Sequence, residues 1–267
     1  MTWVLDCDGV VWLADQVIPG AASAVSRLRK QGQRVVFLTN NSFPRRDEHL
    51  AKLERMGMAT DRDDLISSAM AAARLVNTGE RVLVLGGPGI TEELLRQGVD
   101  VWEPGHESPS TGSGTFDAVV VGFDPQFDFA RLAAATTALR AGARLVATND
   151  DATFPAPGGV LPGAGSFVAA VAKAGGVVAA VAGKPHRAVA ELLGEKVEDI
   201  KIVVGDRPST DGRLAERLGT PFGLVLTGVT PPGHSKLHPQ PAFEAADLAS
   251  LVDQLLDGGA AGSLAPF

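Results

Sequence analysis

Two aspartates directly after the first apolar run of the chain have the residue types and spacing for nucleophilic chemistry. Asp6, Cys7, Asp8 and Gly9 follow the apolar segment Trp3–Leu5. Because side chains alternate along an extended chain, Asp6 and Asp8 can face one cleft while Cys7 points away. An ionised Asp6 could attack phosphorus directly, and Asp8 could protonate the leaving oxygen and later activate water. The two acids could equally make only turn or capping hydrogen bonds.

Polar groups that could hold a phosphate follow two later apolar runs. Thr39 and Asn40 come after Arg34–Leu38, and Lys184 comes after Val177–Val181. Hydroxyl, amide and helix N–H groups can bind phosphate oxygens, and a lysine can neutralise the charge on a phosphoryl group and its nucleophile. Taken singly, the first group is more often a helix cap or turn, and most lysines are solvated surface residues.

A further acidic loop follows the apolar run Lys201–Val204 and contains Asp206 and Asp211. Carboxylate oxygens are the hard ligands that Mg²⁺ prefers, and a bound Mg²⁺ neutralises a phosphoryl group in transfer. The alternative is that the two acids cap a helix starting near Gly212.

These residues need a scaffold that brings strand ends together, and the hydrophobic pattern predicts one. Short apolar runs alternate with longer helical patterns, which indicates an α/β fold with a central parallel sheet flanked by helices. In such a sheet, ligands bind beyond the carboxyl ends of the strands. The predicted strands are Trp3–Leu5, Arg34–Leu38, Arg81–Leu85, Ala118–Val121, Arg144–Ala147, Val177–Val181 and Lys201–Val204. The predicted helices are Ala21–Gln31, Arg46–Met56, Asp64–Val76, Thr91–Arg96, Phe129–Ala141, Ser166–Ala174, Arg187–Leu193 and Gly212–Leu218.

The middle of the chain could form a separate domain, because residues 79–182 have strands and helices of their own. We expect a Rossmann-like core from residues 1–78 and 183–267, with residues 79–182 inserted as an α/β cap. The Pro- and Gly-rich stretches 103–114 and 154–165 are predicted to be loops, and residues 258–263 a loose tail.

Composition argues against several classes of partner. The net charge is −7 and no long run of Lys or Arg occurs, so we expect neither a nucleic acid polymer nor a membrane as partner. Cys7 is the only cysteine, which excludes an intramolecular disulfide. No basic and apolar leader precedes Asp6, and the longest apolar region, 168–182, is too short and interrupted to span a bilayer. We therefore expect a soluble, cytoplasmic protein.

Together, the four polar segments resemble the motifs of the haloacid dehalogenase (HAD) superfamily, in the same order along the chain. The matching segments are Asp6-Cys7-Asp8-Gly9-Val10, Thr39-Asn40-Asn41-Ser42, Gly183-Lys184-Pro185 and the loop from Gly205 to Asp211. Phosphatases of that superfamily have a second Asp at the position of Asp8, so the resemblance implies phosphoryl transfer. The long middle segment is similar to the cap of the NagD-like, nitrophenylphosphatase branch.

The resemblance implies a role for each of these residues. The expected Mg²⁺ ligands are Asp6, the backbone carbonyl of Asp8 and Asp206, and Asp211 would support the metal site directly or through water. Thr39 and Asn40 would bind phosphate, and Lys184 would orient it beside the catalytic pair Asp6 and Asp8. Asn149 and Asp151 would contact the substrate from the cap, since Asn149-Asp150-Asp151 looks like the Asn-Pro-Asp loop of that branch. Asp150 departs from that pattern, as does Arg207-Pro208-Ser209 from the usual fourth motif.

The function expected from this resemblance is Mg²⁺-dependent hydrolysis of small phosphomonoesters through an aspartyl-phosphate. The candidate substrates are phosphoglycolate, glycerol phosphate, sugar phosphates, nucleotides and p-nitrophenyl phosphate. A phosphotransferase or mutase, and a noncatalytic phospho-ligand binding protein, stay open as alternatives. The resemblance makes a homodimer plausible, although no stripe of residues in the sequence indicates an interface.

Overall fold

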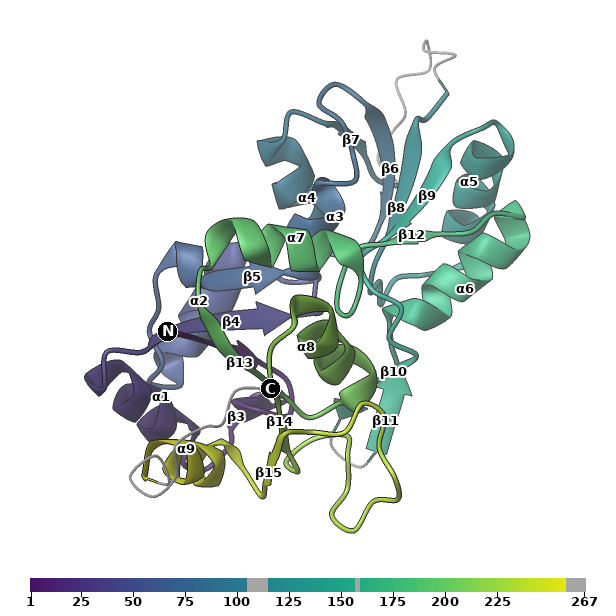
Figure 1. Ribbon diagram of the computed structural model, residues 1–267. Coiled ribbons are helices and arrows are strands. Elements are labelled where there is room, and N and C mark those ends of the chain that lie inside the picture. The colour runs from purple at the N-terminus through teal and green to yellow at the C-terminus, as the bar shows by residue number, and fades with distance from the viewer. Residues whose placement is uncertain (105–114, 157–158, 258–267) are drawn as a thin grey trace. The chain divides into compact units, whose positions relative to one another are not determined.

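The computed structural model describes residues 1–104, 115–156 and 159–257, and it confirms the α/β class. Contacts between Cα atoms divide the chain into two compact units. Unit 1 comprises residues 1–38, 51–65 and 194–267, and unit 2 comprises residues 39–50 and 66–193. Each unit contains its own sheet with helices beside it (Figure 1).

The sheet of unit 1 has the strand order β15-β14-β13-β1-β4-β5. Its strands are β1 (Thr2–Asp6), β4 (Arg34–Thr39), β5 (Leu65–Ser67), β13 (Ile200–Gly205), β14 (Phe222–Val225) and β15 (Phe243–Ala245). β1 lies in parallel between β13 and β4, with Leu5 opposite Val204 on one side and Asp6 opposite Leu38 on the other. Every residue of β1 is buried, as expected for a central parallel strand covered on both faces.

Amphipathic helices complete unit 1. α1 (Ala21–Lys30) and α9 (Leu248–Asp257) pack against one another, and α8 (Arg213–Leu218) packs beside β13 after the π-helix η2 (Pro208–Gly212). α1 buries Ala24, Val25 and Leu28, the spacing of one helix face. A short ribbon of β2 (Trp12–Leu13) and β3 (Gln16–Val17) follows the first strand, and the 3₁₀ helix η1 (Arg62–Asp64) precedes β5.

The sheet of unit 2 has the order β12-β9-β8-β6-β7, and all its pairings are parallel. Its strands are β6 (Arg81–Leu85), β7 (Asp100–Trp102), β8 (Ala118–Val121), β9 (Arg144–Ala147) and β12 (Ala180–Val181). α5 (Phe129–Arg140) and α6 (Ala164–Gly175) cover one face, where alternate residues of β6, β8 and β9 such as Leu83, Val119 and Leu145 form a buried cluster. α3 (Ser68–Ala73) packs against α4 (Pro88–Arg96). α2 (Arg46–Arg55) and α7 (Arg187–Lys196) each cross a unit boundary, and so do β4 and β5, whose residues 39 and 66–67 fall in unit 2.

Most predicted strands and helices match the observed ones within a few residues, and three predictions were wrong. The stretch Asp64–Val76 is not one helix, because it contains β5 and then α3. Ser67 separates the two elements, since its side chain caps α3 by accepting a hydrogen bond from the Met70 N–H. Val177–Val181 contributes only the two-residue strand β12.

The third incorrect prediction concerns the segment 154–165, which is not only a loop. It contains most of a hairpin of β10 (Thr153–Ala156) and β11 (Gly159–Pro162) and the start of α6. Pro and Gly are tolerated in a two-stranded ribbon because its outer edges need no partner. Residues 105–114 of the other predicted loop, and the predicted tail, lie outside the described residues.

The two units have bounds that differ from those of the predicted core and cap. Residues 39–50, 66–78 and 183–193, assigned to the core from the sequence, fall in unit 2. The division into a core and an inserted cap therefore stays a prediction. Across the described part of the chain, no helix combines the length and apolar character that crossing a bilayer requires.

Candidate active site

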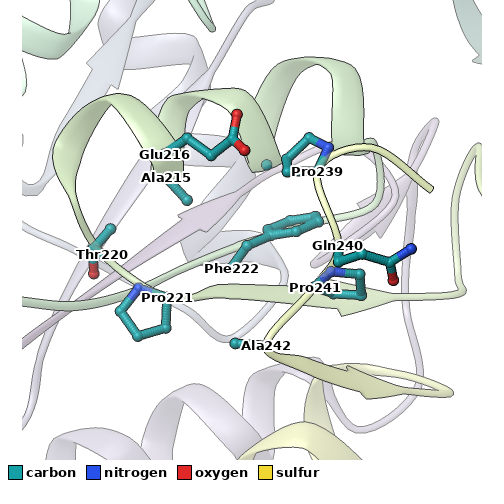
Figure 2. A pocket seen from close by; sticks show the side chains of 10 residues that line it. Ala215, Glu216, Thr220, Pro221, Phe222, Pro239, Gln240, Pro241 and Ala242 are labelled. Carbon is teal, nitrogen blue, oxygen red and sulfur yellow. The ribbon is translucent and has the colours of Figure 1, made fainter. Parts of the chain in front are cut away.

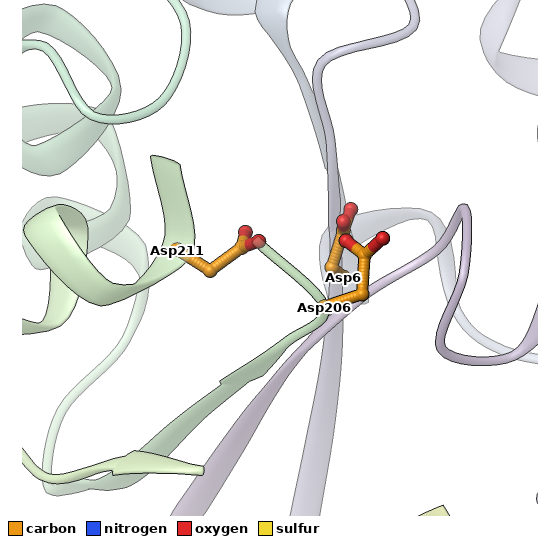
Figure 3. Close-up of side chains that lie close together, drawn as sticks. All are labelled: Asp6, Asp206 and Asp211. Atoms are coloured by element: carbon orange, nitrogen blue, oxygen red, sulfur yellow. The ribbon is translucent and has the colours of Figure 1, made fainter. Parts of the chain in front are cut away.

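Three aspartates of unit 1 converge at the carboxyl ends of two neighbouring strands. Asp6 is the last residue of β1, Asp206 directly follows β13, and Asp211 lies in η2. Because β1 pairs in parallel with β13 and Leu5 lies opposite Val204, both strands end at the same edge. One carboxylate oxygen of each aspartate lies within 4.8 Å of the others. Figure 3 shows Asp6 and Asp206 at the strand ends, with Asp211 reaching them from the helical side.

The three aspartates are buried, so repulsion between their charged carboxylates is only weakly screened by water. Asp6 is 9% exposed, Asp206 is 3% exposed and Asp211 is fully buried. The Cys7 N–H donates to Asp6 Oδ1 at 2.7 Å, and the Thr210 hydroxyl donates to Asp211 Oδ2 at 3.2 Å. Buried carboxylates this close together repel one another unless a cation or a proton compensates them. Oxygens on opposite sides of an octahedral Mg²⁺ lie about 4 Å apart, so this set of donors fits the cation.

Asp8 lies in the tight turn after β1, outside the cluster of three carboxylates. Its Oδ1 accepts a hydrogen bond from the Trp12 indole N–H at 3.0 Å. Gly9 has φ of 82°, a conformation that a side chain disfavours, and a Cβ there would lie 2.6 Å from Asp206 Oδ2. The turn therefore needs glycine at this position both for its backbone angle and for the close approach of Asp206.

The predicted phosphate-binding residues form a connected group in unit 2. Thr39 ends β4, is buried, and accepts a hydrogen bond from the Asn41 N–H through its Oγ1 at 3.0 Å. The Asn40 side chain ties the loop after β4 to the loop after β12. Its Oδ1 accepts from the Lys184 N–H at 2.8 Å, and its Nδ2 donates to the Lys184 carbonyl at 3.1 Å. Lys184 itself is only 2% exposed.

Asn149 and Asp151 join this group in the loop after β9. Asn149 Nδ2 donates to the Asn40 carbonyl at 2.8 Å, and Asn40 Nδ2 donates to Asp151 Oδ2 at 3.0 Å. Between them, Asp150 accepts from His186 at 3.0 Å, and this hydrogen bond holds the pKa of the Asp150 carboxyl below its usual value. The residue that departs from the family pattern is thus hydrogen-bonded to His186.

The structure brings the predicted site residues together as two groups. Asp6, Asp8, Asp206 and Asp211 belong to unit 1, and Thr39, Asn40, Asn149, Asp151 and Lys184 belong to unit 2. Their catalytic and binding roles stay predictions. Sequence reasoning missed Ser68, whose buried hydroxyl donates to the Asn40 carbonyl at 2.7 Å. No signal in the sequence analysis marked this position, because Ser68 lies within the predicted helix Asp64–Val76.

Unit 1 contains a cavity of about 370 Å³ that is lined by residues from Gly212 to Phe222 and from Pro239 to Ala242. Figure 2 shows Phe222 between α8 and the segment from Pro239 to Ala242. Glu216 is the one titratable residue among those that line it. The cavity lacks the convergent acids and phosphate-binding groups found elsewhere, so we do not assign the chemistry to it.

Comparison with known proteins identifies the family of this chain. Residues 3–100 match the family model described as haloacid dehalogenase-like hydrolase, and residues 181–251 match a HAD-hydrolase-like model. The protein therefore belongs to the haloacid dehalogenase-like hydrolases, as its motifs predicted.

Individual relatives place it within the phosphatase branch of that family. Chronophin from Mus musculus is 37% identical over 85% of this chain and 81% of its own length. A crystal structure of glycerol phosphate phosphatase from Mycobacterium tuberculosis in complex with magnesium has a TM-score of 0.80 and 35% identity, covering 94% of this chain and 75% of its own. The p-nitrophenyl phosphatase from Archaeoglobus fulgidus has a TM-score of 0.82 and 26% identity, covering 94% and 98%.

Proposed function

We propose that this protein is a Mg²⁺-dependent phosphatase that hydrolyses small phosphomonoesters through an aspartyl-phosphate on Asp6. The observation that carries the proposal is the convergence of three buried carboxylates, with oxygens within 4.8 Å, at the end of β1, where the sequence resembles the first motif of the family. The relatives support it, because they include enzymes described as phosphatases and one solved with magnesium.

Asp6, Asp206, Asp211 and the Asp8 carbonyl would hold the cation. A bound Mg²⁺ would neutralise the phosphoryl group and relieve the repulsion between the buried carboxylates. Asp206 and Asp211 would act only as ligands, whereas Asp6 has a second role as nucleophile. The hydrogen bond from Cys7 N–H to Asp6 Oδ1 restrains the orientation of this carboxylate before the attack.

The chemistry then divides into two displacements at phosphorus. An oxygen of Asp6 forms a bond to phosphorus while the ester P–O bond breaks, and protonated Asp8 donates its proton to the leaving alcohol. Water next attacks the same phosphorus and gives a proton to the Asp8 carboxylate. The bond to Asp6 breaks, which releases inorganic phosphate and restores both acids. The hydrogen bond from Trp12 to Asp8 Oδ1 supports this role by fixing the side chain.

Residues of unit 2 would hold the substrate. We assign phosphate binding to Thr39 and Asn40 and charge neutralisation to Lys184, whose burial keeps its ammonium away from bulk water. Asn149 and Asp151 would contact the substrate from the cap, and their hydrogen bonds to Asn40 support a position near the phosphate group. This assignment includes the proposed division into a core (1–78 and 183–267) and a cap (79–182).

We propose small phosphomonoesters as the substrates because relatives of this chain are described as phosphatases of such compounds. Glycerol phosphate leads the candidates, because a relative with 35% identity is described as a glycerol phosphate phosphatase. Phosphoglycolate, sugar phosphates, nucleotides and p-nitrophenyl phosphate complete the panel. We also propose a cytoplasmic location, which suits the single buried Cys7, and a homodimer, which light scattering on the purified protein would test.

Phosphate release from this panel, with and without Mg²⁺, tests the proposed function. Wild type should turn over at least one substrate only with the metal, and Asp6→Asn should lower kcat by on the order of 10⁴-fold or more, because it removes the nucleophile. Asp15→Asn is the matched control, since the Asp15 side chain is fully exposed (100%) in the same unit. Folded, Mg²⁺-bound wild type that releases no phosphate from any member would contradict the proposal.

A further inference from the structure

The segment Thr227–Thr230, just beyond β14, contacts both Asp206 and the turn after β1. The Val229 N–H donates to Asp206 Oδ2 at 2.5 Å, and the Thr230 hydroxyl donates to the Asp206 carbonyl at 2.6 Å. The Thr227 hydroxyl donates to the Gly9 carbonyl at 2.5 Å. The segment therefore fixes the side chain and the backbone of Asp206, and also the turn that contains Asp8.

Close packing allows little freedom at this junction. A Cβ at Gly228 would overlap the Asp206 carboxylate, and a Cβ at Gly9 would lie 2.9 Å from Gly228 Cα. Asp206 is 3% exposed and Thr230 is 6% exposed, so water does not compete freely for these hydrogen bonds. Three backbone segments distant in the sequence thus meet at one carboxylate.

We propose that Thr227, Gly228 and Thr230 are positioning residues for the cation, acting through Asp206 and Gly9. This inference rests on the proposed function, because it assumes that Asp206 is a ligand. A carboxylate whose rotation is restrained before the metal arrives loses less entropy on binding. The segment therefore sets Mg²⁺ affinity and contributes little to the chemical step once the metal is bound.

The sequence motif alone does not imply this role. Thr-Gly-Val after a strand has the composition of an ordinary turn. The role is inferred from the contact between residues 227–230 and the Asp206 carboxylate. The parallel pairing of β13 with β14 brings these two parts of the chain together.

The test compares hydroxyl deletions at opposite ends of β13. Thr230→Val removes the hydroxyl bonded to Asp206 and keeps the shape of the side chain. Thr220→Val is the control, because the Thr220 hydroxyl donates to the carbonyl of Ile200, the first residue of β13, at 3.1 Å. Thr230→Ser restores a hydroxyl, and Thr227→Val and Gly228→Ala probe the other two contacts.

Binding of Mg²⁺, and of Mn²⁺ as a paramagnetic substitute, is measured without substrate by calorimetry and electron paramagnetic resonance. We expect Thr230→Val and Thr227→Val to weaken binding roughly tenfold and Gly228→Ala by up to about 100-fold, the range for partners that orient metal ligands. Thr230→Ser should recover most of the affinity, Thr220→Val should match wild type, and kcat at saturating Mg²⁺ should change little.

The inference is overturned if folded Thr230→Val and Thr227→Val bind both cations as tightly as Thr220→Val. It is also overturned if their kcat at saturating Mg²⁺ falls while the affinity is unchanged. Circular dichroism establishes that each variant is folded, and Thr227→Val supplies the result if Thr230→Val does not fold. A wrong proposed function would be recognised separately, because the wild-type protein itself would then bind no metal or release no phosphate.

Discussion

Asp6 and Asp8 are two residues apart and have different surroundings, which suits them to different tasks. Asp6 is buried beside Asp206 and Asp211, whereas Asp8 lies outside that cluster and accepts a hydrogen bond from Trp12. In the proposed mechanism, Asp6 would act as the ionised nucleophile beside the cation. The Asp8 carbonyl would contact the cation, while the Asp8 side chain, outside the cluster, would exchange a proton with the leaving oxygen and with water.

The leaving group should therefore determine how much an Asp8→Asn variant loses. An alkyl phosphate such as glycerol phosphate needs its leaving oxygen protonated, so kcat should fall by about 10²–10⁴-fold. With p-nitrophenyl phosphate, whose leaving group departs without a proton, formation of the aspartyl-phosphate should slow much less. Rapid-quench measurement of nitrophenol release tests this, with Asp15→Asn as the control. Equal losses in the first displacement for both substrates would contradict the assigned role.

At the residue scale, the sequence predicted which acids converge but missed what orients them. Asp6, Asp206 and Asp211 could be selected because the four polar segments occur together, in the order of the motifs of the family. Thr227 and Thr230 could not, because their partners are Gly9 and Asp206, and only the three-dimensional arrangement of strands shows those hydrogen bonds. Ser68 was missed because it lies in a stretch of small residues that predicted a helix.

At the scale of elements, the parallel pairing of β1 with β13 brings Asp6, the proposed nucleophile, close to Asp206, a proposed metal ligand. Sequence separation between Asp6 and Asp206 is large, yet the register of Leu5 with Val204 brings both strands to the same edge. The tight turn after β1 is as necessary as the strands. Gly9 gives this turn its positive φ and leaves room for Asp206 Oδ2.

A Gly9→Ala variant should therefore lose stability and metal binding together. The added Cβ is strained at φ 82° and would lie 2.6 Å from Asp206 Oδ2. We expect a loss of about 1–3 kcal/mol in the free energy of unfolding, from the cost of an alanine held in this conformation. Urea unfolding with and without Mg²⁺ measures both effects. Gly32→Ala is the control for backbone strain alone, because Gly32 also has a positive φ but a Cβ there would have no neighbouring atom within 4 Å. Wild-type Mg²⁺ affinity in folded Gly9→Ala would contradict the second expectation.

Elements with long, regular patterns were predictable, and the short ones were not. Arg81–Leu85, Ala118–Val121 and Arg144–Ala147 were predicted with their observed bounds because each is a continuous apolar run in a buried parallel sheet. β5 is only three residues long and is followed at once by α3, so its apolar residues merged with the helical pattern. Its position depends on pairing at the edge of a sheet, which local sequence does not encode.

At the scale of the whole molecule, unit 2 has a buried hydrophobic cluster on the face of its sheet that α5 and α6 cover. Unit 2 contains an ion pair between Glu80, in the turn before β6, and Arg144, the first residue of β9. The hydrogen bond from Arg144 is the main cause that lowers the pKa of Glu80 from 4.5 to about 2. Because this pKa is lowered in the folded state, the pair stabilises unit 2 above pH 4.5.

That stabilisation should decline as the pH falls from 4.5 towards about 2, where the folded protein also binds the proton. Glu80→Gln should reduce the free energy of unfolding by about 1 kcal/mol near neutral pH, after allowance for solvent screening, and by less in acid. Urea unfolding at several pH values measures the difference, with the exposed Glu54→Gln as control. A difference between Glu80→Gln and wild type that does not shrink in acid would contradict this pKa.

The central claim is that Asp6 becomes phosphorylated during turnover, and peptide mass spectrometry after an acid quench tests it most directly. Asp8→Asn is mixed with Mg²⁺ and p-nitrophenyl phosphate and quenched within the first turnover, because slowed hydrolysis should make the intermediate accumulate. The account predicts the mass of one phosphoryl group on the peptide that contains Asp6, and none in Asp6→Asn. Phosphate release by wild type with no phosphoryl group on Asp6, or with one on another residue, would contradict it.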